Sequence, residues 1–175
     1  MRILVTGGVR SGKSTHAESL IGGAPATYVA TGTVPDVEDD ADWTARIAAH
    51  RSRRPESWAT LETQDIASVI REAHDPVLID CLGTWLTALI DAAGAWEHDV
   101  DAVHQLVLAR ADEVVSALQS CDEDVVVVTN EVGLGVVPEH RSGRLFRDLL
   151  GLVNQRIAAA CDEVHLVIAG RVIRL

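Results

Sequence analysis

The chain has 175 residues, 47% of them hydrophobic, and a formal net charge of −11, which predicts one domain over residues 1–175 with a substantial core. The negative charge argues against general binding to nucleic acids or anionic membranes, because both attract basic surfaces. No hydrophobic run approaches the roughly 20 residues that span a bilayer, and the N-terminus does not resemble a signal peptide, so we expect a soluble, cytoplasmic protein.

The first predicted elements form a strand, a loop and a helix. Residues 2–6 are a hydrophobic, β-branched run that leads into glycines, which predicts a strand. Residues 13–21 carry hydrophobic side chains at helical spacing, and Gly22 follows them. This pattern predicts a helix that ends at the glycine.

A second short strand is expected at 27–30. It is followed by an acidic stretch from Gly32 to Asp42 that contains glycine and proline, which favours a solvated loop. A helix is expected next, at about 42–50.

The rest of the chain alternates predicted strands with predicted helices. Three nearly continuous hydrophobic runs are typical of strands covered on both faces: 77–80, 125–129 and 164–168. Hydrophobic side chains at helical spacing mark helix faces within 103–118 and 145–157. This alternation predicts an α/β fold with a mostly parallel central sheet flanked by helices, and the motif described next makes it a P-loop NTPase-type (RecA-like) domain.

A phosphate-binding loop connects the first strand to the first helix. The segment satisfies the pattern G-x-x-x-x-G-K-[ST], in the strand-loop-helix setting that its mechanism requires. Backbone N–H groups of such a loop converge on phosphate oxygens, the lysine reaches the β- and γ-phosphates, and the hydroxyl of the last residue ligates magnesium. We therefore expect a purine nucleoside triphosphate with Mg²⁺ to bind this loop, which consists of Gly7, Gly8, Val9, Arg10, Ser11, Gly12, Lys13 and Ser14.

A P-loop also needs a carboxylate on a neighbouring strand to hold the metal's water shell. Asp80 ends one hydrophobic strand, and Glu131 follows another. We favour Asp80, together with Ser14, because an aspartate directly ending a hydrophobic strand is the usual partner of the metal. The alternative is that Asp80 caps a helix or is an exposed acid at a strand end.

A basic segment interrupts the otherwise acidic chain. It contains Arg46, His50, Arg51, Arg53 and Arg54. Arginine forks match phosphate oxygens, so the segment is a candidate anion site, although a solvated helix end paired with acids 36–42 explains the arginines equally well. A neutral histidine among arginines is a competent nucleophile or general base, which makes His50 the catalytic candidate beside Lys13.

The other histidines are weaker candidates. His16 follows the phosphate-binding loop by only two residues and is a lesser candidate. The remaining five are interpreted as surface or packing residues: His74, His98, His104, His140 and His165.

Several further motifs occur in one order along nearly the whole chain. They include YVATGT at 28–33, RIAAHRSRRPESW at 46–58, VLIDCLGTWLTALI at 77–90 and TNEVGLGVVP at 129–138, with FRDLLGLVNQ beginning at 146. Together with the loop at 3–18 they resemble the bifunctional adenosylcobinamide kinase/adenosylcobinamide-phosphate guanylyltransferase family of cobalamin biosynthesis. Where this family often has Asp-x-Glu-Met before its R-I-x-x-H segment, the present chain has EDDADW at 38–43.

The resemblance implies two reactions. ATP or GTP phosphorylates the aminopropanol hydroxyl of adenosylcobinamide, and GMP then passes from GTP to adenosylcobinamide phosphate through a guanylylated histidine, which corresponds to His50. It also implies a homo-oligomer, a trimer in particular. Beyond the loop, it assigns nucleotide contacts to the positions that match Thr31, Gly32, Thr33, Arg51, Ser52, Arg53, Arg54, Glu62 and Asp80.

Two other functions remain compatible with these residues. In a single-step small-molecule kinase, the loop and Asp80 would act while His50 only clamps a phosphate. In a regulatory module, GTP would bind without being transferred, because the fold alone does not prove turnover.

Overall fold

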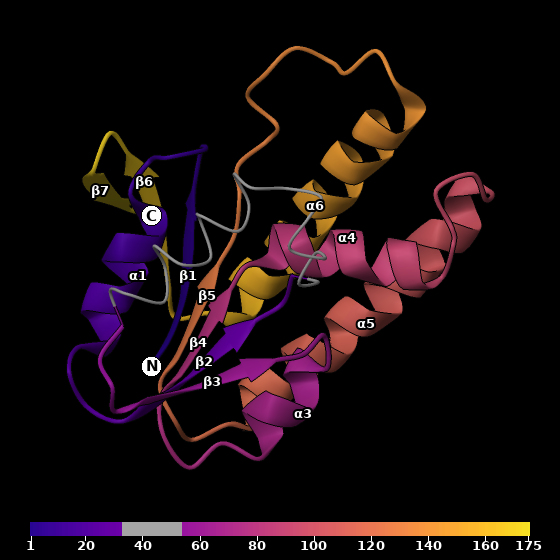
Figure 1. The fold of residues 1–175 in the computed structure, drawn as a ribbon. Coiled ribbons are helices and arrows are strands. Elements are labelled where there is room, and N and C mark those ends of the chain that lie inside the picture. The colour runs from indigo at the N-terminus through magenta and orange to yellow at the C-terminus, as the bar shows by residue number, and fades with distance from the viewer. Residues whose placement is uncertain (33–53) are drawn as a thin grey trace, which may run out of the picture.

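The computed structural model describes residues 1–32 and 54–175. The strands of this part form one seven-stranded sheet in the order β3-β2-β4-β5-β1-β6-β7 (Figure 1). All neighbouring pairs are parallel except β6 and β7. The strands are β1 (Arg2–Gly7), β2 (Ala26–Ala30), β3 (Trp58–Glu62), β4 (Val77–Asp80), β5 (Val125–Val128), β6 (Glu163–Ile168) and β7 (Arg171–Arg174). The predicted α/β class with a mostly parallel sheet is confirmed.

Helices cover the two faces of the sheet unequally (Figure 1). The first face packs against α3 (Ile66–Arg71), α4 (Leu82–Ala92), α5 (Val100–Ser120) and α6 (Arg141–Ala160). In the described part of the chain, the second face packs against α1 (Lys13–Ile21) alone.

The alternation of side chains along the strands explains these two layers, because successive residues of a strand point to opposite faces. Leu4, Ile79 and Val127 belong to the hydrophobic cluster under α3–α6. Ile3 and Leu78, which are their neighbours in sequence, belong to the cluster under α1. The strands therefore read as continuous hydrophobic runs because both faces are buried.

The predicted strands at the centre of the sheet and the predicted helix at 13–21 are present. The strand β3 and the helices α3 and α4 were not predicted from the sequence. Of the five residues of β3 only Trp58 is buried, and all four residues of β7 are exposed. Neither edge strand has the hydrophobic run by which strands were recognised. The helix expected at 42–50 lies outside the described residues.

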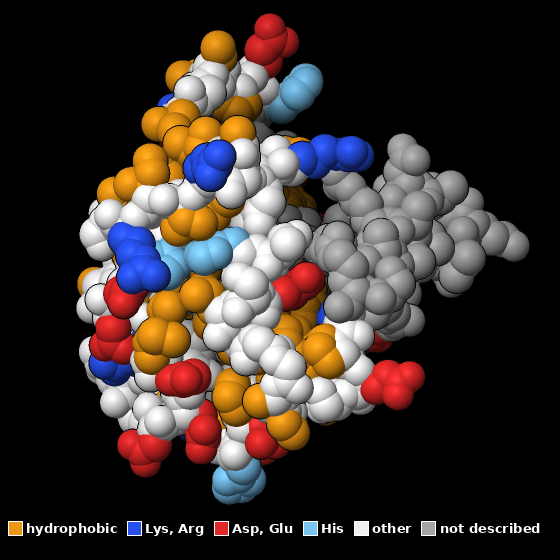
Figure 2. All heavy atoms as spheres, turned by 90° about the vertical axis from the view of Figure 1, so that its left-hand side faces the viewer, with side chains coloured by type: hydrophobic (Ala, Val, Ile, Leu, Met, Phe, Trp, Pro, Cys, Tyr) orange, Lys and Arg blue, Asp and Glu red, His pale blue; other side chains and the backbone are white. Residues whose placement is uncertain are grey.

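Figure 2 shows the side of the molecule that carries α1, β6 and β7, with hydrophobic side chains exposed on it. The exposed hydrophobic side chains of this part of the fold include Val172, Ile173 and Leu175 near the C-terminus. No helix among residues 1–32 and 54–175 is both long enough and hydrophobic enough to cross a membrane.

Candidate active site

The phosphate-binding loop lies between the end of β1 and the start of α1, as predicted. Two of its residues have left-handed backbone conformations, Arg10 at φ 56° and Gly12 at φ 96°. The loop is closed by a hydrogen bond from Ser11 N–H to Gly8 O at 3.3 Å. It is tied to the turn after β6 by a bond from Gly170 N–H to Ser11 O at 2.8 Å. These contacts fix the loop on both sides of its bend.

Two glycines of the loop are required by its geometry. A Cβ at Gly7 would lie 2.5 Å from Val167 O, a distance at which the backbone of β6 would have to move. Gly12 adopts positive φ at low cost and, as the N-cap of α1, offers no side chain to the first turn. The N–H groups of that turn and the helix dipole thus suit an anion, as a bound phosphate requires.

The loop also contains a buried polar atom that suits this ligand. Within the described residues, the Ser11 hydroxyl is buried without a hydrogen-bond partner. Lys13 is the only lysine of the 175-residue chain, and its ammonium group donates to Gly8 O at 3.2 Å, so it lies over the loop. Ser14 follows in the first turn of α1 and is partly exposed. The loop therefore fits a triphosphate, with Ser14 as the hydroxyl that would meet a metal ion.

Both candidate carboxylates lie at the same edge of the sheet as the loop. Asp80 is in register with Val128 of β5, which is in register with Val5 of β1. Its carboxylate accepts a hydrogen bond of 3.2 Å from the Tyr28 hydroxyl. Glu131 donates its backbone N–H to Gly7 O at 3.1 Å, while its carboxylate accepts from Gly133 N–H at 2.6 Å within its own loop. Asp80 therefore remains our predicted metal-side residue.

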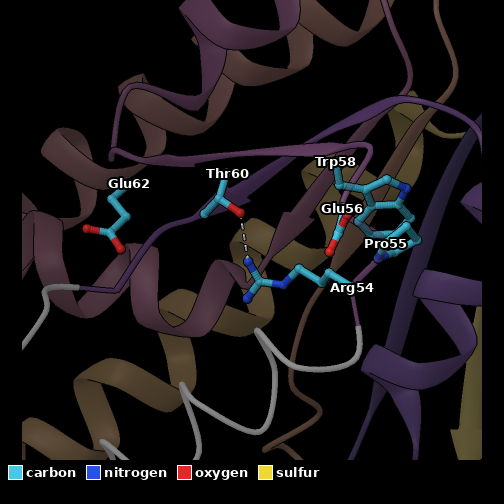
Figure 3. Close-up of a pocket in the computed structure, with 6 residues that line it drawn as sticks. All are labelled: Arg54, Pro55, Glu56, Trp58, Thr60 and Glu62. Carbon is cyan, nitrogen blue, oxygen red and sulfur yellow. Dashed lines mark hydrogen bonds between the residues drawn. The ribbon is translucent and has the colours of Figure 1, made fainter.

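A shallow pocket opens beside β3 (Figure 3), with a volume of about 480 Å³. Arg54 donates from Nη1 to Thr60 Oγ1 at 3.0 Å, and its guanidinium carbon lies 3.4 Å from the centre of the Tyr28 ring. Glu62 projects at the end of the same strand (Figure 3). The structure thus places two of the predicted nucleotide-binding residues at one pocket, which is lined by Arg54, Pro55, Glu56, Trp58, Thr60 and Glu62.

A buried polar network lies beneath the strand ends. The hydroxyl of Thr31, a predicted nucleotide-binding residue, is turned into this network, where it donates to Cys81 O at 2.7 Å and lies 2.8 Å from the Thr84 hydroxyl. Thr31 as a whole is only 1% exposed, so the structure buries this predicted nucleotide-binding residue. Asn154 of α6 contacts the two residues that follow β5, donating to Asn130 O and accepting from the Thr129 hydroxyl.

Sequence reasoning missed Tyr28, Thr84 and Asn154. Each lies within a motif that carries the family resemblance, but neither the residue patterns nor the resemblance assigned it a role. The predicted site residues Thr33, His50, Arg51, Ser52 and Arg53 lie outside the described residues.

His16 and His165 form a pair between α1 and β6. Nε2 of His16 lies 2.9 Å from Nδ1 of His165, whose Nε2 lies 2.8 Å from the Glu163 carboxylate. His165 is 1% exposed, which confirms its interpretation as a packing residue. Burial, and then the neighbouring His165, lower the pKa of His16. The described contacts of His16 are therefore those of a residue that anchors α1 to the sheet.

A family model described as cobinamide kinase / cobinamide phosphate guanyltransferase matches residues 3–175. The chain belongs to this family. Its relatives include the proteins named bifunctional adenosylcobalamin biosynthesis protein CobU from Salmonella typhimurium (46% identical) and Escherichia coli (45% identical). In each case the match covers 97% of both chains. The protein named CobP from Pseudomonas aeruginosa is 36% identical, with 97% of this chain and 94% of that one covered.

Proposed function

We propose that this protein is a bifunctional transferase of cobalamin biosynthesis that carries out both reactions in one domain. The first phosphorylates the aminopropanol hydroxyl of adenosylcobinamide with ATP or GTP. The second transfers GMP from GTP to adenosylcobinamide phosphate, giving adenosylcobinamide-GDP and pyrophosphate. The observation that carries the proposal is the family match over residues 3–175. The phosphate-binding loop at the carboxyl edge of the sheet supports it.

The kinase step needs positioning and charge stabilisation. The acceptor hydroxyl oxygen attacks the γ-phosphorus and gives up its proton to solvent, the bond from that phosphorus to the β–γ bridging oxygen breaks, and the nucleoside diphosphate leaves. Lys13 and the N–H groups at the start of α1 hold the phosphates and stabilise the charge on the transferred group. Mg²⁺, when bound through Ser14 and Asp80, would neutralise further phosphate charge.

The guanylyl step needs a nucleophile, and we assign this role to His50. An imidazole nitrogen attacks the α-phosphorus of GTP, the bond to the α–β bridging oxygen breaks, and pyrophosphate leaves. A phosphate oxygen of adenosylcobinamide phosphate then attacks the same phosphorus, and the nitrogen–phosphorus bond breaks to regenerate His50. Arg51, Arg53 and Arg54 would balance the charge at this centre, since guanidinium groups pair well with phosphate oxygens.

Incubation with α-labelled GTP, without acceptor, tests this assignment. A phosphorus–nitrogen bond to imidazole is labile in acid and stable in base. The label should therefore be lost in acid, survive alkali and leave the protein when adenosylcobinamide phosphate is added. His50→Ala should abolish the adduct and retain part of the kinase activity, whereas the matched control His74→Ala, at an exposed position, should behave as wild type.

Two results would contradict the assignment: an adduct on the His50→Ala protein, or equal loss of both activities in a folded variant. Kinase turnover by a wild-type protein that never forms an adduct would instead identify a single-step kinase. Nucleotide binding without any turnover of adenosylcobinamide would identify a GTP-binding module.

We also propose that the protein acts in the cytoplasm as a homo-oligomer, with a trimer as the expected state. The exposed hydrophobic side chains Val172, Ile173 and Leu175 support association, because such surface patches commonly mark contact sites. Light scattering coupled to size-exclusion chromatography would measure the mass, and a monomer at micromolar concentration would contradict this part of the proposal.

A further inference from the structure

Tyr28 is the only tyrosine of the chain and lies at the middle of β2. It is in register with Thr60 of β3 on one side and with Leu78 of β4 on the other. Its side chain is 3% exposed and packs in the hydrophobic cluster under α1. Asp80 follows Leu78 by two residues, so the Asp80 side chain leaves the sheet on the same face.

The hydroxyl and the ring of Tyr28 have different partners. The hydroxyl donates to Asp80 Oδ2 at 3.2 Å. The face of the ring carries the Arg54 guanidinium, whose carbon lies 3.4 Å from the ring centre, well within the range of a cation–π interaction. One buried side chain therefore contacts both the metal-side carboxylate and Arg54, the one arginine of the basic segment that the structure describes.

The contacts of Arg54 indicate that its orientation depends on Tyr28. Besides the ring, the guanidinium contacts the Thr60 hydroxyl, which accepts from Nη1 at 3.0 Å. Within residues 1–32 and 54–175, the buried Nε of Arg54 has no hydrogen-bond partner. Among the described residues, the Tyr28 ring of β2 and the Thr60 hydroxyl of β3 are thus the groups that hold the Arg54 guanidinium in place.

The hydrogen bond from the Tyr28 hydroxyl to Asp80 is of the charge-assisted kind, because its acceptor is a carboxylate. Such hydrogen bonds are stronger than those between neutral groups.

We propose that Tyr28 is a positioning residue for the metal-side carboxylate and for an arginine that serves the phosphates. Its hydroxyl fixes the Asp80 carboxylate, and its ring fixes the Arg54 guanidinium. It touches neither the nucleotide nor the acceptor itself. The inference rests on the proposed function, in which Asp80 serves the metal ion and Arg54 serves the phosphates.

Tyr28→Phe tests the hydroxyl alone, because it keeps the ring and most of the packing. The apparent Mg²⁺ affinity in the kinase reaction should weaken by roughly three- to tenfold, the loss expected for one hydrogen bond to a charged group. At saturating Mg²⁺ the kinase kcat and the rate of adduct formation should approach wild type.

A readout that does not depend on turnover is the thermal stabilisation by a non-hydrolysable GTP analogue, measured with and without Mg²⁺. The part of the stabilisation that requires Mg²⁺ should shrink in Tyr28→Phe. The part seen without Mg²⁺ should not.

Tyr28→Leu tests the ring, because it also removes the surface under Arg54. Adduct formation from α-labelled GTP, per folded molecule, should slow by a further factor of about three to ten relative to Tyr28→Phe, as expected for loss of a partly buried cation–π contact. Should this variant fail to fold, Thr60→Val removes the other anchor of Arg54 at an exposed position. It should slow adduct formation without changing the Mg²⁺ dependence.

Trp85→Phe is the matched control. This buried side chain of α4 donates from its indole nitrogen to Gln64 O and packs on the other face of the sheet. It should lower stability without changing the Mg²⁺ dependence or adduct formation per folded molecule.

Two outcomes overturn the inference: an unchanged Mg²⁺ requirement in Tyr28→Phe, or the same change in Trp85→Phe. In both cases the wild type still performs the two reactions. A wild type that performs neither contradicts the proposed function instead, so the two failures are distinguishable.

Discussion

The two faces of the central sheet differ in what their side chains do. Under α3–α6, buried side chains such as Leu149 and Trp85 make a large hydrophobic cluster. Under α1 the cluster is smaller, and its member Tyr28 contacts charged groups at the edge of the sheet. We infer that the first face mainly supplies stability, whereas the second face and its carboxyl edge supply the chemistry. Substitutions on the two faces should then affect different measurements.

Lys13→Ala should give the largest separation of activity from stability. Its ammonium group contributes one hydrogen bond to Gly8 O, so the melting temperature should change little. Both activities should fall by about 10³-fold or more, since a single site orients the phosphates and loses its main cation. Steady-state assays at saturating nucleotide measure this. Retention of either activity would show that the two reactions use separate phosphate sites.

Leu149→Ala should do the reverse. The side chain is 0% exposed within α6, so its truncation should lower the free energy of unfolding by about 2–5 kcal/mol. Activity per folded molecule should stay close to wild type at a temperature where the variant is folded. Urea unfolding combined with active-site titration checks both values. A large loss of kcat in the folded variant would break the proposed division between the faces.

Asp80→Asn should reduce magnesium-dependent turnover by about 10²-fold, because a neutral amide holds a metal's water shell poorly. The exposed Asp75, which precedes β4, provides the matched control as Asp75→Asn. Kinase rates as a function of Mg²⁺ concentration, alongside melting curves, separate the two roles. Normal activity per folded molecule with a collapsed melting temperature would make Asp80 structural and would favour Glu131 as the metal-side residue.

The smallest effect is expected from His16 and concerns pH. Because burial lowers the pKa of His16 in the folded state, the unfolded chain takes up a proton first as the pH falls. The stability contribution is therefore full above the unfolded pKa of about 6.5 and decreases as the pH falls below it. His16→Gln should flatten the dependence of melting temperature on pH between about 7.5 and 5, whereas His74→Gln should not. Equal slopes in wild type and His16→Gln would contradict this linkage.

The parts of the fold that the sequence predicted are those with a strong local signal. The loop from Gly7 to Ser14 has a fixed pattern between a strand and a helix, and the central strands are continuous hydrophobic runs. The edge strands β3 and β7 lack this signal because most of their side chains face solvent. The helix α4 was missed because it begins only two residues after Asp80 ends β4 and its first turn contains Gly83 and Thr84, which are weak helix formers.

The candidate site was predictable only in part for a different reason. Lys13, Ser14 and Asp80 could be named from motifs, but the contact between Tyr28 and Asp80 depends on β2 lying next to β4, and that of Arg54 depends on β3 lying next to β2. Strand order is a long-range property that periodicity does not encode. The inward orientation of Thr31 likewise follows from its neighbours Cys81 and Thr84 rather than from its own position in the motif.

The central position of β1 has a consequence for the order of events during synthesis. Among the strands that the structure describes, β1 is synthesised before the others, yet its two neighbours are β5, which begins at Val125, and β6, which begins at Glu163. The strand that carries the phosphate-binding loop therefore has no sheet neighbour until β5 has emerged, and it lacks its second neighbour until β6 has emerged. Such distant pairing slows folding and exposes a hydrophobic strand in the meantime. Nascent chains that stop before Glu163 should accordingly fail to bind nucleotide.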